Sequence, residues 1–527
     1  MSRTIIVGGG ISGLTAACFL ASEKHQVTLI EKSDKLGGLV SSYNYKGFVI
    51  DGGIRSTENS GILFPMLRQL GIDLEFVKSD VTLGVKEDLI KISNQSDVES
   101  YKALLFRQFP EEKKALELIF KDIYMFMGFM DVLYGIDNPL FLNPIKDRKY
   151  FLKHIFPWLF KFVFTVGKLN KYKMPVNTYL EQYTSNKTLI DLIAQHFFQD
   201  TPVIFALSYF SLYIDYYYPL GGTGKIIDEL ESYAIAHQVK IVKNTMIDHI
   251  DYGLQEVYDM AHQAYPYDYL IWSANAKSLY QKIDVNSVSK QSLKRKLIQQ
   301  RDYLKDLKGG DSVFTTYLFA NLDSSYFEKI TTGHLFYTPV AENLLNLTNL
   351  IRLCQNQSKE VVIQQLKHYL RSTTYEISIP VLRDSSLAPQ GQTALIVSVL
   401  MDYDLVKNIL DQGWVDEMNE LFYQTMLEVL NQTVFPNLKN YVFDYFTSSP
   451  VSIQERVLTD NGAITGWAFT NASNPSTDRI IKVASSVKTI FPMILQTGQW
   501  AYTPAGLPTG IMTGKLAANY VNKRSKK

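Results

Sequence analysis

The residues best suited to chemistry stand near the start of the chain, where a glycine-rich turn follows an apolar run. Thr4–Val7 is typical of a strand buried on both faces, and Gly8–Gly13, with the sequence GGGISG, follows directly. In this spacing Gly8 makes a tight turn, Gly10 lets the backbone approach a pyrophosphate, and Gly13 lets the next helix lie near the strand. Amides at the start of that helix then face the phosphates. The pattern predicts a dinucleotide-binding site.

A second strand ends in an acidic residue at the matching place. Gln26–Ile30 runs into Glu31, whose carboxylate can accept hydrogen bonds from both hydroxyls of an adenosine ribose, which favours an unphosphorylated ribose. Leu14–Ser22, between the two strands, is small and apolar enough for a helix that packs closely on a sheet. Strand, turn, helix, strand and acid in one register therefore predict nucleotide binding.

The choice between NAD and FAD rests on two further glycine-containing segments. Lys32–Leu39 contains the pair Gly37-Gly38, and Phe48–Gly53 ends in Asp-Gly-Gly; a nicotinamide dehydrogenase has no reason for these glycines. Here the chain resembles the two-dinucleotide-binding-domain flavoproteins, the superfamily of amine oxidases, protoporphyrinogen oxidases and phytoene desaturases. In that superfamily the glycine pair wraps the FAD pyrophosphate and ribose, and a basic residue commonly follows it, where this sequence has Leu39.

Later segments extend the resemblance toward phytoene desaturases and their saturase and isomerase relatives. Asp215–Lys225 resembles their aromatic-Pro-x-Gly-Gly element, after which the chain returns to the nucleotide domain. Tyr269–Ala276 looks like a later strand and turn at the edge of FAD, and the residue near Met246 presents backbone to adenine in the family. Gly498–Gly514 resembles the family's closing motif, and a helix from about Pro508 would point its amides at the flavin.

Motifs and resemblance together name a set of site residues. The predicted cofactor contacts are Gly8, Gly10, Ile11, Ser12, Gly13, Glu31, Lys32, Gly37, Gly38, Leu39, Gly53, Ile54, Arg55, Met246, Ala274, Gly498, Gly506, Leu507, Pro508 and Thr509. Arg55 is also the one catalytic candidate, because a guanidinium near the flavin can stabilise an anionic ring or orient a substrate; an arginine at the surface or in an ion pair is the alternative. The predicted substrate contacts are Tyr217, Tyr218, Trp500 and Tyr502, with simple packing as the alternative for the first two.

We expect an α/β fold in which a Rossmann-like FAD-binding domain is interleaved with a mixed-sheet substrate domain and a helical cap. The predicted FAD-binding segments are 1–60, 216–280 and 451–527, the helical cap is 61–215, and the substrate-binding domain is 281–450. Leu63–Leu70 and Tyr101–Leu133 are predicted helices of the cap. Gly310–Pro339 and Thr393–Tyr403 alternate as strands of the mixed sheet do.

Composition excludes several classes of function. A net charge of +1 over 527 residues gives no field that would attract nucleic acid. Two cysteines support no disulfide framework, so a cytoplasmic, reducing location is expected. The eight histidines are scattered and form no hydrolase or metal motif, so no metal is predicted. Aromatic residues reach 13%, which suits a large apolar cavity or simply a large core.

One segment bears on membrane contact. Tyr150–Phe164 mixes bulky apolar side chains with lysines, as a helix at a membrane surface would. The alternative is a core helix of the cap whose lysines reach the surface. No run of about 18 uncharged apolar residues occurs, so we expect no spanning helix, and a location at the cytoplasmic face of a membrane stays open.

The predicted function is that of an FAD-dependent oxidoreductase acting on carbon-carbon bonds of an apolar isoprenoid, polyene or other lipid, by desaturation, saturation or isomerisation. One alternative is an amine-oxidase-like flavoenzyme for a small polar substrate. Another is a flavin-dependent double-bond isomerase without net redox turnover, or a flavoprotein that only binds lipid.

Overall fold

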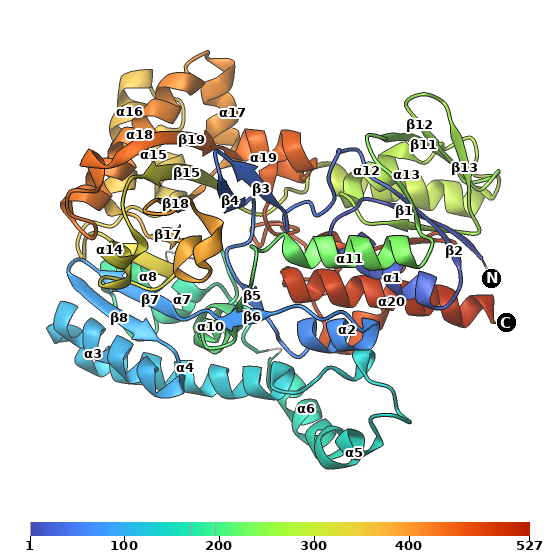
Figure 1. Cartoon of the computed structure of the whole chain (residues 1–527), viewed down its shortest axis with the longest axis horizontal. Coiled ribbons are helices and arrows are strands. Elements are labelled where there is room, and N and C mark those ends of the chain that lie inside the picture. The colour runs from blue at the N-terminus through green and yellow to red at the C-terminus, as the bar shows by residue number, and fades with distance from the viewer. Residues whose placement is uncertain (1, 170, 195–196, 527) are drawn as a thin grey trace.

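The computed structural model describes residues 2–169, 171–194 and 197–526, which form two adjoining parts, each built on its own sheet (Figure 1). The first sheet has five parallel strands in the order β10-β2-β1-β14-β20. The strands are β1 Arg3–Val7, β2 Gln26–Ile30, β10 Lys240–Val242, β14 Tyr269–Trp272 and β20 Ile494–Gln496. The predicted Rossmann-like α/β fold is confirmed, and its strands come from three distant stretches of the chain.

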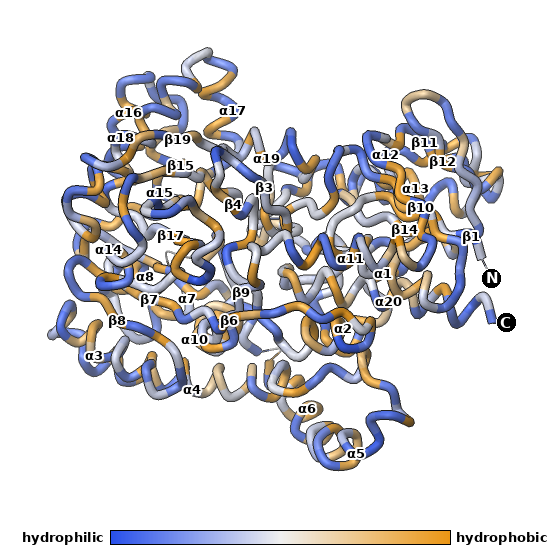
Figure 2. Tube along the Cα trace, in the orientation of Figure 1, coloured by the Kyte–Doolittle hydropathy of each residue, from blue (hydrophilic) through white to orange (hydrophobic). Residues whose placement is uncertain are grey.

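Helices cover one face of this sheet, and a small antiparallel sheet lies on the other. The covering helices are α1 Ile11–Ser22, α2 Leu63–Leu70, α11 Lys225–Ala236 and α20 Leu507–Ser525. A Cβ built on Gly514 would lie 2.4 Å from the Ser12 carbonyl oxygen, so α20 approaches α1 closely only because this residue is glycine. Apolar residues are concentrated on β14 (Figure 2), whose four residues are all buried, because strands covered on both faces need no polar side.

The opposite face carries elements that follow β10 in the chain. These elements are β11 Ile247–Asp251, β12 Glu256–Asp259, β13 Ala264–Pro266, α12 Ala276–Lys282 and α13 Gln291–Lys305. Leu297 and Leu304 of α13 are buried in the same cluster as Ile5 and Val7 of β1. α13 thus packs with the first part, whereas the sequence prediction places residues 281–450 in the substrate-binding domain.

The second part is built on a seven-stranded mixed sheet in the order β19-β15-β18-β17-β16-β7-β8. The strands are β7 Val81–Val85, β8 Asp88–Ile92, β15 Ser312–Ala320, β16 His334–Thr338, β17 Tyr375–Ser378, β18 Thr393–Met401 and β19 Val442–Ser448. Only the β16–β7 pair is parallel among the strands of this sheet. Its helices are α14 Ser324–Glu328, α15 Leu347–Cys354, α16 Lys359–Ser372, α17 Tyr403–Asp411, α18 Val415–Gln432 and α19 Pro450–Val457.

A hairpin and a small three-stranded sheet lie between the two parts. The hairpin of β3 Ser42–Tyr45 and β4 Phe48–Asp51 packs Phe48 and Ile50 against Tyr317 and Phe319 of β15. A three-stranded sheet joins β5 Thr57–Glu58, β9 Tyr216–Pro219 and β6 Phe76–Lys78.

The segment 61–215, predicted as a helical cap or substrate domain, also contains strands. β7 and β8 belong to the large sheet, and all five residues of β7 are buried, so the strand shows no alternation of apolar and polar residues. The single helix predicted over Tyr101–Leu133 is two helices, α3 Val98–Gln108 and α4 Lys113–Tyr134. Pro110 causes the break, because proline cannot donate its amide and keeps Phe109 out of the helical conformation.

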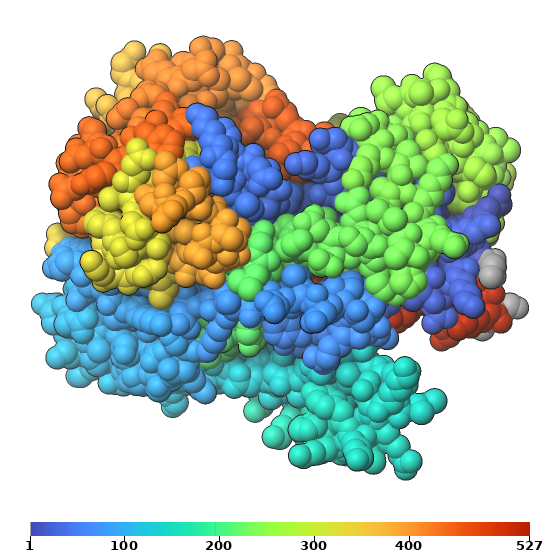
Figure 3. Space-filling view, in the orientation of Figure 1, coloured from blue at the N-terminus to red at the C-terminus, as the bar shows by residue number. Residues whose placement is uncertain are grey.

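The remaining helices pack beneath the large sheet, except for one pair that projects from the body (Figure 3). The packed helices are α7 Val176–Leu180, α8 Lys187–Ala194, α9 Val203–Leu207 and α10 Tyr209–Tyr213. The projecting pair is α5 Arg148–Tyr150 and α6 Phe156–Leu169, joined by a π-helical segment, Phe151–Ile155. Phe156, Phe160 and Phe164 are 66%, 65% and 74% exposed, so the core-helix interpretation of this segment is wrong. Within the described residues, we find no helix with the length and apolar character needed to cross a bilayer.

Candidate functional site

The glycine turn has the geometry that its spacing predicts. Gly8 has φ +106°, in the left-handed region that favours glycine, and a Cβ there would lie 2.7 Å from the Ser273 carbonyl oxygen. A Cβ on Gly13 would lie 2.0 Å from the Gly8 carbonyl oxygen. Gly10 differs, because the nearest atom to its built Cβ is the Gly37 oxygen at 4.0 Å. The turn thus leaves room in front of Gly10, where a pyrophosphate would approach the first amides of α1, including Ile11 and Ser12.

Glu31 lies at the carboxyl end of β2, beside this turn. Its Oε2 accepts a hydrogen bond from the Gly9 amide at 2.7 Å, and its Oε1 accepts one from the Ser33 amide at 3.0 Å. These bonds orient the carboxylate at the sheet edge where dinucleotides bind in such folds. The Thr245 amide donates to the Glu31 carbonyl at 2.9 Å, which brings the neighbouring Met246 to the same edge.

The second glycine pair lies directly on the first turn. The Gly37 amide donates to the Gly9 carbonyl at 2.9 Å, and a Cβ on Gly38 would lie 3.8 Å from the Gly10 Cα. On the other side of the pair, the Ile54 amide donates to the Leu39 carbonyl at 3.1 Å. A Cβ on the preceding residue, Gly53, would lie 2.1 Å from that same oxygen. The segments predicted to surround the pyrophosphate are therefore in contact.

The C-terminal block completes the same edge. The Gly498 amide donates to the Thr513 hydroxyl at 2.8 Å, and a Cβ on Gly498 would lie 3.1 Å from the Ser12 hydroxyl. Ala274 follows β14 beside Gly8. Gly506 precedes α20, whose first turn contains Leu507, Pro508 and Thr509. The amide end of α20 thus lies at the sheet edge near the start of α1, as the closing motif predicts.

Lys32 does not point toward this space. Its ammonium donates to the carbonyl oxygens of Arg456 at 2.7 Å and Glu455 at 3.3 Å, near the end of α19. Burial lowers the pKa of Lys32 despite the nearby charge of Glu31. The side chain therefore ties the dinucleotide part to α19, so the predicted cofactor contact at this residue is not supported by its orientation.

Arg456 places a guanidinium beside the second glycine segment. It donates to the Gly52 carbonyl at 2.8 Å and lies 3.4 Å from the Ser41 hydroxyl, close to Leu39. Much of the Arg456 residue is exposed. Sequence reasoning missed this arginine, because α19 reaches the glycine segments only in the folded chain.

Asp51 joins the loop at Gly52 and Gly53 to the Asp215–Lys225 block. Its carboxylate accepts from the Tyr218 hydroxyl at 2.7 Å and from the Thr223 amide and hydroxyl at 2.9 and 2.7 Å. Tyr218 is fully buried, which leaves it no surface for a substrate, so its packing role is favoured. Tyr217 is half-buried and packs edge-on against Phe64 at 4.9 Å.

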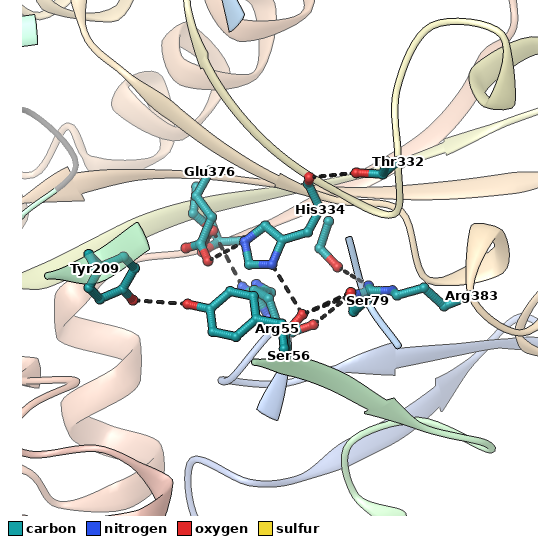
Figure 4. Close-up of polar contacts among 12 residues, drawn as sticks. Arg55, Ser56, Ser79, Tyr209, Thr332, His334, Glu376 and Arg383 are labelled. Carbon is teal, nitrogen blue, oxygen red and sulfur yellow. Dashed lines mark hydrogen bonds and ion pairs between the residues drawn. The ribbon is translucent and has the colours of Figure 1, made fainter. Parts of the chain in front are cut away.

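Arg55 is buried at the centre of a polar cluster (Figure 4). It donates to the Asp51 carbonyl at 2.7 Å and lies 3.4 Å from the Ser398 hydroxyl. Arg383 donates to the Arg55 carbonyl at 2.7 Å and to the Ser56 hydroxyl at 3.2 Å. The alternative of a surface arginine is therefore wrong, and Arg55 has a structural connection to both parts.

The same cluster contains a histidine and a carboxylate that sequence reasoning missed. His334 Nδ1 lies 3.1 Å from the Ser56 hydroxyl, and its Nε2 lies 3.1 Å from Glu376 Oε1 (Figure 4). Burial lowers the pKa of His334, although Glu376 opposes this shift. The Tyr216 ring stacks on His334 at 5.6 Å, and the Tyr216 hydroxyl donates to Tyr209 at 3.0 Å.

Glu58 lies at the start of α20. A Cβ on Gly506 would lie 3.3 Å from Glu58 Oε1. Desolvation raises the pKa of Glu58 to about 7, and the charge of Asp215 adds to the shift. A carboxyl group with this pKa exchanges its proton near neutral pH, which is a property of general acids and bases.

A large cavity lies between α4, α6, α9 and the loops before and after β20. Its volume is about 710 Å³, within the range of small-molecule sites. The lining is mainly apolar and includes Met130, Tyr134, Val166, Phe205, Ile480 and Tyr502. Tyr502 and Thr503 are buried, whereas Ile481 is 78% exposed, so the cavity extends from the surface toward the segment before α20. Tyr502 thus lies where a substrate contact is predicted, while Trp500 is buried against Trp467.

In the described ranges, no group of three or more His, Cys, Asp or Glu residues is arranged to hold an ion.

Comparison with known proteins supports the fold and the N-terminal motif. The family model of the NAD(P)-binding Rossmann-like domain matches residues 6–70. The chain is 26% identical over 258 residues to a 4,4'-diapolycopen-4-al dehydrogenase of Metabacillus indicus, covering 47% of this chain and 50% of the relative. It is 23% identical over 342 residues to an inactive all-trans-retinol 13,14-reductase of Danio rerio, covering 59% and 53%. The chain thus spans about half the length of these curated relatives.

A solved structure matches over nearly the whole chain. Putrescine oxidase bound to putrescine has a TM-score of 0.61 and 13% sequence identity, and the match covers 99% of both chains. This likeness shows a shared fold.

Proposed function

We propose that this chain, an FAD-binding protein of the amine oxidase superfamily, is an oxidoreductase that acts on carbon-carbon bonds of an apolar isoprenoid, polyene or other lipid. The observation that carries this proposal is the apolar cavity of about 710 Å³, whose buried end at Tyr502 leads toward α20. The names of two relatives, a diapolycopenal dehydrogenase and an inactive retinol reductase, agree with a long apolar substrate.

The residues around the glycine turn fit FAD. Glu31 is oriented to accept hydrogen bonds from the ribose hydroxyls, and the open space at Gly10 admits a pyrophosphate to the amide end of α1. Arg456 supplies the positive charge that Leu39 lacks, beside Gly52. The amide end of α20 adds a second positive pole. When bound, the flavin supplies the hydride chemistry.

The chain's own residues then provide orientation, exclusion of water and a proton. The apolar cavity wall aligns a long substrate and keeps water from it. Glu58 is suited to hold or release a proton at Oε1, because its pKa of about 7 populates both forms near neutral pH. Arg383 and His334 position the loop that contains Arg55 and Ser56.

The experiment that tests this proposal is anaerobic mixing of the FAD-loaded protein with candidate polyenes, retinoids and diamines, with the flavin absorbance as readout. Bleaching by an apolar polyene and a product that differs by two hydrogens would support the proposal. A saturation reaction would require a reductant, and its signature is consumption of that reductant together with the polyene. Loss of flavin absorbance with a diamine alone would contradict the proposal.

One specific observation favours a second candidate, an amine-oxidase-like enzyme for a small polar substrate. The cluster of Arg55, His334, Glu376 and Arg383, in which Arg55 and His334 are buried, is unusually polar for a site that meets only hydrocarbon. The fold likeness to putrescine oxidase is compatible with it. Peroxide production from an amine distinguishes this candidate. A lipid that changes geometry with no electron acceptor consumed would instead indicate an isomerase, and one that binds unchanged would indicate a lipid-binding protein.

A further inference from the structure

The projecting segment that runs from Ile145 through α6 exposes an apolar surface. Its members, called the α6 face below, are Ile145, Leu152, Phe156, Leu159, Phe160, Val163 and Phe164, all between 48% and 87% exposed. Within α6 the positions 156, 160 and 164 are four residues apart and 159 and 163 lie between them, so they form one stripe of the helix. Folded proteins rarely leave such a contiguous apolar patch to water, and one that persists marks an interaction site.

The helix that carries this face is held firmly to the body. The Trp158 indole donates to the Val132 carbonyl of α4, and the Asp137 amide donates to the Tyr150 hydroxyl at 2.9 Å. Val166 and Leu169, on the opposite side of α6, are buried. The three phenylalanines are therefore exposed while α6 is packed on the body, and not because the helix has come loose from it.

Charge identifies the kind of partner. Residues 145–174 contain seven lysines, one arginine and one aspartate, a net charge of +7 in a chain whose total is +1. Lys153, Lys161 and Lys168 are exposed around the apolar stripe. Among ion pairs in the described part of the chain, only that of Lys173 with Asp478 involves this segment. A second copy of the same face would repel it, whereas a surface of anionic lipid headgroups would attract it.

The cavity adjoins the α6 face. Val166 and Leu169 line the cavity from the inner side of α6, and the exposed residues Lys173 and Ile481 line its outer end. Because the same helix carries the α6 face and lines the cavity, an apolar molecule leaving a bilayer at this face would be about one helix width from the apolar cavity.

We propose that the α6 face inserts into the headgroup region of an anionic membrane, and that the cavity beside it receives its ligand directly from the bilayer. The second clause rests on the apolar substrate of the proposed function; the first does not. Aromatic and aliphatic residues on one side of a helix with lysines around them are the arrangement by which amphipathic helices bind such surfaces.

Co-sedimentation of the purified full chain with vesicles tests the docking. The vesicles are phosphatidylcholine alone, or phosphatidylcholine with about 30% phosphatidylglycerol, because anionic lipid is the attracting component. The test variant combines Phe156→Ser, Phe160→Ser and Phe164→Ser. The matched control combines Leu254→Ser and Met260→Ser, which are 66% and 64% exposed on the distant β11–β13 sheet. Bound FAD and the thermal melting curve are measured on every variant.

We expect the wild type and the control to sediment with anionic vesicles, less so at high salt, and the triple variant to bind at least tenfold more weakly with unchanged FAD and melting curve. Failure of the wild type to bind anionic vesicles would overturn the proposal, whatever the FAD content. So would equal binding by the triple variant. A wild-type dimer that the triple variant abolishes, without vesicle binding, would assign the face to self-association instead.

Ligand entry has its own readout. With a polyene embedded in anionic vesicles, the triple variant should bind it at least tenfold more slowly than the wild type, while both bind detergent-dispersed polyene alike. Equal rates from vesicles would overturn direct entry. Failure of both proteins to bind polyene from detergent would contradict the apolar substrate of the proposed function. Membrane docking would then be judged by the co-sedimentation experiment alone.

Discussion

The carboxylate of Asp51 accepts a hydrogen bond from the hydroxyl of Tyr218 at 2.7 Å, across 167 positions of sequence. Asp51 ends β4, directly before Gly52 and Gly53, and Tyr218 lies in β9, where the chain returns from the cap. Both side chains are almost wholly buried. This bond holds the segment of Gly52 and Gly53 against the return strand, so the shape of the predicted cofactor site depends on a residue that need not touch the cofactor.

Replacing this carboxylate tests that dependence. Asp51→Ala leaves the buried Tyr218 hydroxyl and the Thr223 amide without their acceptor, which we expect to destabilise the protein by about 2–4 kcal/mol and to weaken FAD binding. Denaturant unfolding with and without FAD measures both effects. Asp302→Ala, at an exposed position of α13, is the control and should leave both unchanged. Normal stability in Asp51→Ala would contradict the role assigned to this bond.

Two glycines of the turn should respond differently to the same substitution. Gly13→Val places a side chain where even a Cβ lies 2.0 Å from the Gly8 carbonyl oxygen, so it should impair folding. Gly10→Val faces open space, so the protein should fold but lose FAD, because the side chain occupies the pyrophosphate position. Circular dichroism and the flavin-to-protein absorbance ratio separate these effects. Stoichiometric FAD in folded Gly10→Val would contradict the assignment of the site.

Arg456 should contribute to FAD affinity although it lies far from the glycine motifs in sequence. We expect Arg456→Gln to raise the dissociation constant of FAD about tenfold, since one charge-assisted contact to a phosphate is lost, and Arg456→Lys to restore part of it. Titration of the apoprotein, followed by flavin fluorescence, measures the constants. Lys482→Gln, an exposed cation away from the turn, is the control. Unchanged affinity in Arg456→Gln would show that another group replaces the missing basic residue at Leu39.

Glu58 predicts a pH dependence of stability. Its pKa rises from 4.5 to about 7 in the folded protein, so between these values the native state holds a proton that the unfolded state releases. Its contribution to stability is therefore fully present below about pH 4.5 and is lost as pH rises toward 7. Glu58→Gln removes this dependence, so the variant should gain roughly 3 kcal/mol relative to the wild type between pH 4.5 and 8. Denaturant unfolding of both proteins across this range provides the measurement. A constant difference between them would contradict the raised pKa.

The sequence predicts the first glycine turn well, because its function depends on neighbours within one strand-turn-helix unit. Gly8 and Gly13 have the conformation and the close approach that the spacing requires. The same locality explains why α2 has the predicted bounds. Motifs that depend on a few adjacent residues can be predicted without knowledge of the rest of the chain.

Contacts between residues far apart in the sequence cannot be predicted in this way. The cluster of Ser56, His334, Glu376 and Arg383 is assembled from a loop, two strands of the large sheet and a further loop, so no local spacing indicates it. Lys32 has the sequence position of a cofactor contact, yet the end of α19 offers its ammonium carbonyl partners. β7 is not predicted as a strand, because burial on both faces removes the alternation of apolar and polar residues that identifies strands.

The central claim, an FAD protein for an apolar substrate, is tested most directly by the absorbance spectrum of the purified protein, with mass spectrometry of the small molecules that copurify. We predict flavin bands, about one FAD per chain as a single dinucleotide site requires, and a bound polyene or other lipid. FAD without any apolar ligand, together with peroxide production from an amine, would contradict the substrate. Absence of flavin even after reconstitution with FAD would contradict the account as a whole.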